Sequence, residues 1–195
     1  MSQEKVMKPT IPFPFAVAIT VSILLIFGFF LGKWNFTLWI VFITWAEYFV
    51  FGATPSVGKA MLPGLAIGCF TAAVWCANWV LFMDLFNSQF PDFVSWLILS
   101  ATNFIWVVAL CYIIERVEMF QAYGLALFNG LTLFLAVYFT FLGGAQNVVP
   151  MHVGDLTNPY WVIIWCFIWT LLMEWLGYFA AVFNVWITFP REVKA

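Results

Sequence analysis

Six long apolar runs, separated by short polar segments, make up most of this chain. Each run is close to the ~20 apolar residues that an α-helix needs to cross the hydrocarbon core of a bilayer. The polar segments leave no room for a soluble domain, so we expect residues 1–195 to form a single membrane domain. The predicted fold class is an all-α integral membrane protein with six transmembrane helices. The predicted spans are residues 14–31, 36–51, 60–86, 93–114, 122–142 and 160–186.

The composition supports this class and excludes others. Hydrophobic residues make up 65% of the chain and charged residues 8%, far from the roughly 25% charged residues of a soluble domain. A disordered protein, a nucleic-acid-binding protein and a cytosolic enzyme are therefore excluded. The expected partners are the lipid bilayer and a small-molecule solute, with no nucleic acid.

The basic residues predict the orientation of the spans. Cytoplasmic segments of membrane proteins are enriched in Lys and Arg. If the N-terminus is inside, six basic residues lie inside and only Lys33 lies outside. We therefore predict a multi-pass protein of the inner (plasma) membrane with both termini in the cytoplasm. The six inner residues are Lys5, Lys8, Lys59, Arg116, Arg191 and Lys194.

Two segments resemble each other at an offset of 90 residues. Residues 46–51 align with 136–141, and residues 75–84 align with 165–174, with eleven identities in the 39 positions from Ala46 to Asp84. The pattern predicts a 3+3 inverted repeat, with units at about 14–90 and 93–187, because a unit of three spans re-enters the membrane upside down. The alternative is that both segments are ordinary aromatic span sequence.

Three carboxyl groups fall in the predicted spans, where ionisable groups are costly and often functional. Glu47 lies near the middle of the second span, and we expect it to be buried and to face the protein interior. Glu174 lies in the last span and aligns with Asp84 near the end of the third. Such groups could carry or gate a proton; the alternative is a structural hydrogen bond between helices.

Aromatic and amide side chains complete the candidate solute path. Trp75 and Trp79 are four residues apart, as are Trp165 and Trp169, so each pair lies on one helix face. Together the pairs could form an aromatic constriction or a cation–π site, or they could be simple packing. The path candidates are Glu47, Tyr48, Trp75, Asn78, Trp79, Asp84, Tyr138, Trp165, Trp169 and Glu174. Other Asn and Thr residues in the spans, including Thr44, Asn129 and Thr170, are interpreted as helix–helix contacts.

Residues 36–80 resemble a family of short bacterial inner-membrane proteins of unknown function. The resemblance rests on Thr44-Trp45-Ala46-Glu47-Tyr48-Phe49, a Gly-rich turn beginning at Gly52, and a following Gly/Trp helix through Trp75. It implies a membrane location but no catalytic residue. In size and span count the chain is also similar to the small urea and amide channels, although it lacks their motifs.

Three classes of function compete. The favoured class is a channel or gradient-driven transporter for a small cation, an amine or a small polar neutral solute such as an amide. The alternative is a membrane anchor or accessory subunit of a larger complex. An integral-membrane enzyme is disfavoured because the chain has one histidine, His152, which with Asp155 makes only a weak metal signal. We expect no catalytic residue, cofactor or metal, and we expect a homo-oligomer because large aromatics provide wide contact faces.

Overall fold

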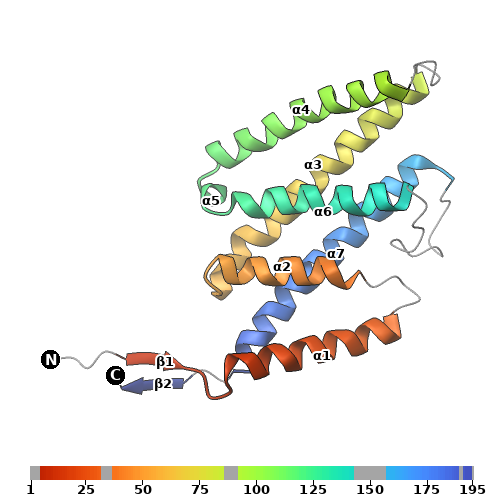
Figure 1. The fold of residues 1–195 in the computed structure, drawn as a ribbon. Coiled ribbons are helices and arrows are strands. Elements are labelled where there is room, and N and C mark those ends of the chain that lie inside the picture. The colour runs from red at the N-terminus through yellow and green to blue at the C-terminus, as the bar shows by residue number, and fades with distance from the viewer. Residues whose placement is uncertain (1–4, 32–36, 86–91, 143–156, 189–190, 195) are drawn as a thin grey trace.

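The computed structural model describes residues 5–31, 37–85, 92–142, 157–188 and 191–194. Its architecture is helical, with one short sheet at the chain ends (Figure 1). The elements are β1 (Lys5–Lys8), α1 (Phe13–Leu31), α2 (Leu38–Val50), the 3-10 helix η2 (Pro55–Val57), α3 (Gly58–Leu85), α4 (Asp92–Arg116), α5 (Glu118–Gln121), α6 (Gly124–Leu142), α7 (Pro159–Trp186) and β2 (Arg191–Lys194).

Each predicted span corresponds to a helix. Three helical segments are long and apolar enough to cross a membrane, namely Pro55–Leu85, Phe93–Arg116 and Pro159–Trp186. The helices α1, α2 and α6 contain shorter apolar stretches. With 13 residues, α2 is roughly 20 Å long, less than the ~30 Å hydrocarbon core. The 28 residues of α7 form one continuous helix of roughly 42 Å, longer than the ~30 Å hydrocarbon core.

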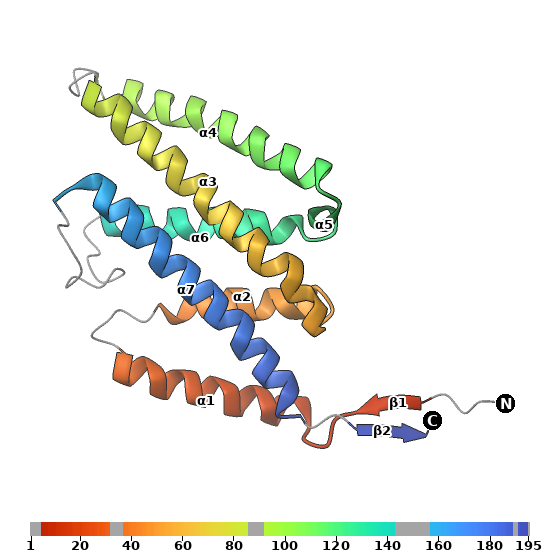
Figure 2. The ribbon, with the colours of Figure 1, turned by 180° about the vertical axis from the view of Figure 1, so that it is seen from behind.

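The helices form two crossing sets. In Figure 1, α1, α2 and α6 run roughly alongside one another, and α3 and α7 cross behind them. Seen from behind, α3 and α7 pass in front as neighbours (Figure 2). The main contacts join α3 to α6, α2 to α7, and α3 to α7. At the edges, α4 packs on α3, and α1 packs on α7.

Glycines bring both crossing pairs into close backbone contact. A Cβ atom on Gly68 of α3 would overlap the Leu127 carbonyl of α6, and one on Gly130 of α6 would overlap the Leu65 carbonyl of α3. In the other pair, a Cβ atom on Gly177 of α7 would lie 2.5 Å from the Val41 carbonyl oxygen of α2. Small residues at such crossings let membrane helices approach closely and gain van der Waals contact.

The short helix α2 ends in a left-handed turn. The amide of Ala53 donates to the Tyr48 carbonyl at 3.0 Å, and that of Gly52 donates to the Phe49 carbonyl at 3.1 Å. This is the Schellman arrangement, which needs a positive φ; Gly52 adopts φ 92°. The chain therefore reverses within a few residues and starts η2 and then α3.

Both chain ends meet in a two-stranded antiparallel sheet that the sequence analysis did not predict. β1 pairs with β2 in a register that places Lys5 opposite Lys194 and Lys8 opposite Arg191. The sheet extends from the end of the helices where α1 begins and α7 ends (Figures 1 and 2). Four-residue strands were not recognisable because so short a segment carries almost no periodicity, and their partners lie at opposite ends of the chain.

Candidate functional site

Two carboxyl groups are buried on helices that pack against each other, α2 and α7. Glu47 of α2 is 3% exposed and Glu174 of α7 is fully buried. The two groups are close enough to interact electrostatically. Burial of Glu47 confirms the expectation from the sequence. We call Glu47 and Glu174 the carboxyl pair.

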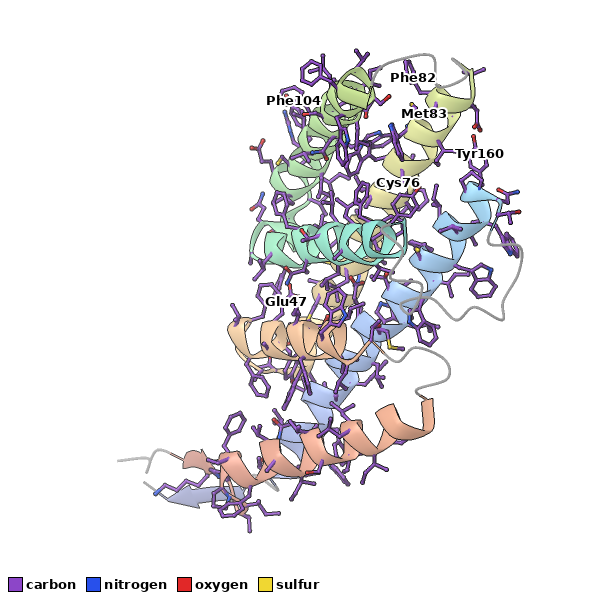
Figure 3. The ribbon with its side chains drawn as sticks, turned by 45° about the vertical axis from the view of Figure 1, so that its right-hand side comes forward. Glu47, Cys76, Phe82, Met83, Phe104 and Tyr160 are labelled. Atoms are coloured by element: carbon purple, nitrogen blue, oxygen red, sulfur yellow. The ribbon has the colours of Figure 1, made fainter. Side chains whose placement is uncertain are left out.

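The carboxyl pair lacks hydrogen-bond partners. None of its four oxygen atoms has one among the residues that the structure describes. The side chain of Asn129, on α6, faces the Glu47 carboxyl group without reaching hydrogen-bonding geometry. In Figure 3, Glu47 lies between α2 and α6. Three helices, from both halves of the chain, therefore supply polar groups to one buried place.

Two hydroxyl groups lie on the same helix faces as the carboxyl pair. Thr44 precedes Glu47 by three residues, and Thr170 precedes Glu174 by four, so each belongs to its neighbour's face. Both threonines are fully buried and their hydroxyl oxygens also lack hydrogen-bond partners. The hydroxyl oxygens of these threonines are therefore available, like those of the carboxyl pair, as hydrogen-bond acceptors.

Local packing explains why the pair forms. Gly177 lies one turn beyond Glu174, and its missing side chain admits the α2 backbone at Val41 and Trp45. That contact aligns the stretch of α2 that carries Glu47 with the middle of α7. Glu47 itself lies in the last turn of α2, one turn from an exposed bend, and not near the middle of its helix as the sequence analysis expected.

Tyrosine rings line one side of this region. The rings of Tyr48 and Tyr178 meet edge to face, with centroids 5.6 Å apart. The Tyr178 hydroxyl donates to the Pro55 carbonyl at 3.3 Å and lies against Gly58, which fixes that ring to the bend between α2 and α3. The Tyr48 hydroxyl is buried without a hydrogen-bond partner.

Tyr138 lies in a different part of the core. It is 1% exposed and stacks on Phe134 at 5.9 Å within α6. The thiols of Cys76 and Cys166, on α3 and α7, interact electrostatically with its hydroxyl group. The two tyrosines that align in the repeat, Tyr48 and Tyr138, therefore both lie buried, but in separate groups of residues.

The four deep tryptophans belong to the apolar core between α3, α4, α6 and α7. The indole N–H of Trp75 donates to the Thr102 hydroxyl of α4 at 3.0 Å. The indole nitrogens of Trp79 and Trp165 are buried without a hydrogen-bond partner, and the Trp165 ring meets Trp161 edge to face. Trp169 packs against the same core. Trp75 thus faces α4.

Asn78 and Asp84 lie away from the carboxyl pair. Asn78 is exposed on α3. Asp84 is also exposed, near the end of α3, and accepts a hydrogen bond from the Tyr160 hydroxyl at 3.2 Å. Since Glu174 lies in the middle of α7, the two carboxyl groups that align at the 90-residue offset occupy different positions along their helices. His152 and Asp155 lie outside the described residues.

Sequence reasoning found Glu47 and Glu174 separately but did not pair them. It also assigned Asn129, Thr44 and Thr170 to helix packing. The sequence did contain a signal for this polar cluster, because Thr44 and Thr170 each lie one helical turn before a glutamate. What was missing was the crossing of α2 and α7 at Gly177, which depends on tertiary packing.

No protein-family model, curated protein or solved structure matches this chain.

Proposed function

We propose that this protein transports a small ammonium-type cation, such as ammonium or a protonated short amine, across the inner membrane. The observation that carries the proposal is the carboxyl pair, two buried acids from α2 and α7 without hydrogen-bond partners. An unpaired carboxylate in a low-dielectric interior is costly unless a cation or a proton neutralises it. The pair therefore has the properties of a site whose ligand supplies positive charge.

The chemistry of the site favours a cation with several N–H donors. Carboxylate and threonine oxygens are acceptors, and an ammonium group supplies donors together with charge. The nearby rings of Tyr48 and Tyr178 add aromatic surface that attracts cations. The C-terminal end of α2 carries a partial negative charge, and its last turn holds Glu47.

Burial of the carboxyl pair favours an occluded transporter over an open channel. Glu47 and Glu174 are almost inaccessible, yet Glu47 is only one turn from the exposed bend at residues 52–56. A separation of α2 from α7 near Gly177 would expose the site. The membrane potential or an ion gradient would supply the driving force.

The contact pattern supports a six-span inverted repeat in this transporter. Exchanging the halves pairs α1 with α4, α2 with α6, and α3 with α7. That exchange turns the α3–α6 contact into α7–α2, and the α3–α4 contact into α7–α1, and all four contacts occur. Inverted repeats place solute sites between their halves. The carboxyl pair, with Asn129, joins helices from both halves.

Uptake into proteoliposomes tests the proposal. The full chain is reconstituted into liposomes that hold an inside-negative potential. Uptake of labelled methylammonium is measured, with labelled acetamide as the neutral comparison. We expect methylammonium uptake, and a loss of about tenfold or more in Glu47→Gln and Glu174→Gln, because charge-assisted hydrogen bonds are worth about 1.5–3 kcal/mol each.

Asp84→Asn is the matched control, because Asp84 is an exposed carboxyl group on the same bundle. It should retain uptake. Acetamide uptake that does not depend on Glu47 and Glu174 would replace the proposal with a neutral-solute channel. Absence of both activities, with recovery of a stoichiometric protein partner from native membranes, would indicate an accessory subunit instead.

A further inference from the structure

We propose that the groove between α1 and α7, together with the sheet β1–β2 at its end, binds one anionic phospholipid from the adjacent membrane leaflet. The groove lies on the face of α7 opposite Glu174, and the proposal does not depend on the transported solute.

The groove fits an acyl chain. It encloses about 450 Å³ between two facing stripes of side chains. Each stripe has the i, i+3, i+4, i+7 spacing of one helix face. Its only hydroxyl, on Thr20, already donates to the Ala16 carbonyl at 3.0 Å. Phe27 and Phe179 are more than half exposed, so the groove opens toward lipid. The stripes are Thr20, Ile23, Leu24 and Phe27, and Leu176, Phe179, Ala180 and Phe183.

The sheet concentrates positive charge at one end of this helix pair. Four of its eight residues are basic, and Glu192 is its only acidic residue. The register sets Lys5 opposite Lys194 and Lys8 opposite Arg191. Residues 5 and 8 are three apart, so the two basic pairs lie on opposite faces of the sheet. Like charges directly opposite each other destabilise a strand pair, so an anion beside the Lys8–Arg191 pair would stabilise this sheet. The phosphate of a lipid headgroup supplies that charge.

The spacing between the groove and the sheet matches the spacing between the hydrocarbon core and the headgroups of a bilayer. The amides of Thr10 and Ile11 donate to the Thr188 carbonyl at 2.9 and 3.0 Å, which ties the start of α1 to the end of α7 beside the sheet. Thr20 follows Phe13 by seven residues, so the groove starts roughly 10 Å along α1. The headgroup region is roughly 5–8 Å deep on each side. The basic residues therefore fall at headgroup level when the groove lies in hydrocarbon.

Native mass spectrometry of the full delipidated chain tests this site. The probes are phosphatidylglycerol, phosphatidylcholine with the same acyl chains, and glycerol phosphate. We expect retention of one phosphatidylglycerol, weaker retention of phosphatidylcholine, and no retention of glycerol phosphate. Lys8→Gln and Arg191→Gln should each weaken phosphatidylglycerol binding about fivefold, because each basic residue contributes ~1 kcal/mol near an anionic surface.

Two variants make the test specific. Lys59→Gln removes an exposed basic residue at the start of α3, outside the sheet, and should leave binding unchanged. Ala180→Leu narrows the groove and should weaken retention of both lipids. Equal retention of the two lipids, or full retention by the Lys8→Gln/Arg191→Gln double variant, would overturn the proposal. Strong binding of glycerol phosphate would assign a site for soluble phosphates instead.

Discussion

At the scale of single residues, the carboxyl pair is an energetically costly feature of the described core. Two carboxyl groups are buried together, and no hydrogen bond reaches any of their oxygens. A group kept only for packing would be tolerated better as an amide or as an apolar side chain of similar size. If the glutamates bind a cation, replacing either one by a neutral residue should raise the stability of the unliganded protein. If they serve folding, the same replacement should lower it.

We expect Glu174→Gln to raise the stability of the unliganded protein by about 1 kcal/mol or more, because it removes an unpartnered ionisable group from the core. The measurement is thermal unfolding in detergent without amines. The same variant should lose the stabilisation that added methylammonium gives the unaltered protein. A clear loss of stability without ligand would make Glu174 a structural residue.

Trp75 offers a cleaner test of a single hydrogen bond. We expect Trp75→Phe to destabilise the protein by roughly 1 kcal/mol beyond the smaller ring's effect, because it leaves the Thr102 hydroxyl of α4 without its donor. Trp79→Phe is the control, since the buried Trp79 indole nitrogen has no hydrogen-bond partner. Comparable losses in both variants, measured by unfolding, would show that ring packing dominates at Trp75.

At the scale of elements, hydrophobicity predicted where helices lie but not how they cross. The predicted span 160–186 became α7 (Pro159–Trp186) because twenty or more apolar residues leave few alternatives in a bilayer. The span 36–51 agrees with α2 (Leu38–Val50) to within two residues at each end, and the turn that follows depends on a left-handed Gly52. The point where two helices cross depends on which glycine contacts which stretch of backbone. The hydrophobicity of a segment does not identify that stretch.

Gly177 is the residue on which the α2–α7 crossing depends. We expect Gly177→Ala to cost about 1–3 kcal/mol and to impair uptake, because the added methyl group would lie 2.5 Å from the Val41 carbonyl oxygen. Gly124→Ala is the matched control: its methyl group would meet the flexible side chain of Ile114 at 3.1 Å. Equal unfolding stability of both variants would mean that α2 and α7 separate at little cost.

At the scale of the whole molecule, both termini lie at one end of the bundle (Figure 1). Six of the seven basic residues belong to segments predicted to face the cytoplasm. We expect a reporter fused after Ala195 to be active only in the cytoplasm. A fusion active in the periplasm would contradict the predicted orientation, with both termini in the cytoplasm.

The exposed face of α4 bears on how the whole molecule assembles. Little of the apolar stretch of α4 is buried, and its outer face carries large side chains such as Phe93, Trp96 and Phe104. We expect α4 to pair with its counterpart in a homo-oligomer, with a separate solute site in each protomer. Native mass spectrometry in mild detergent should give multiples of 22.4 kDa, reduced to the monomer by Phe104→Lys. A 22.4 kDa species in every detergent would contradict the prediction.

The sheet that joins the chain ends also constrains biosynthesis. Lys8 pairs with Arg191, so β1 must wait for its partner until 183 further residues have been synthesised. The same delay applies to α1, because its main packing partner, α7, is synthesised last. Until α7 is made, the first helix therefore lacks its main packing partner. A nascent chain that stops before α7 would also lack the Thr188 carbonyl that accepts from the amides of Thr10 and Ile11.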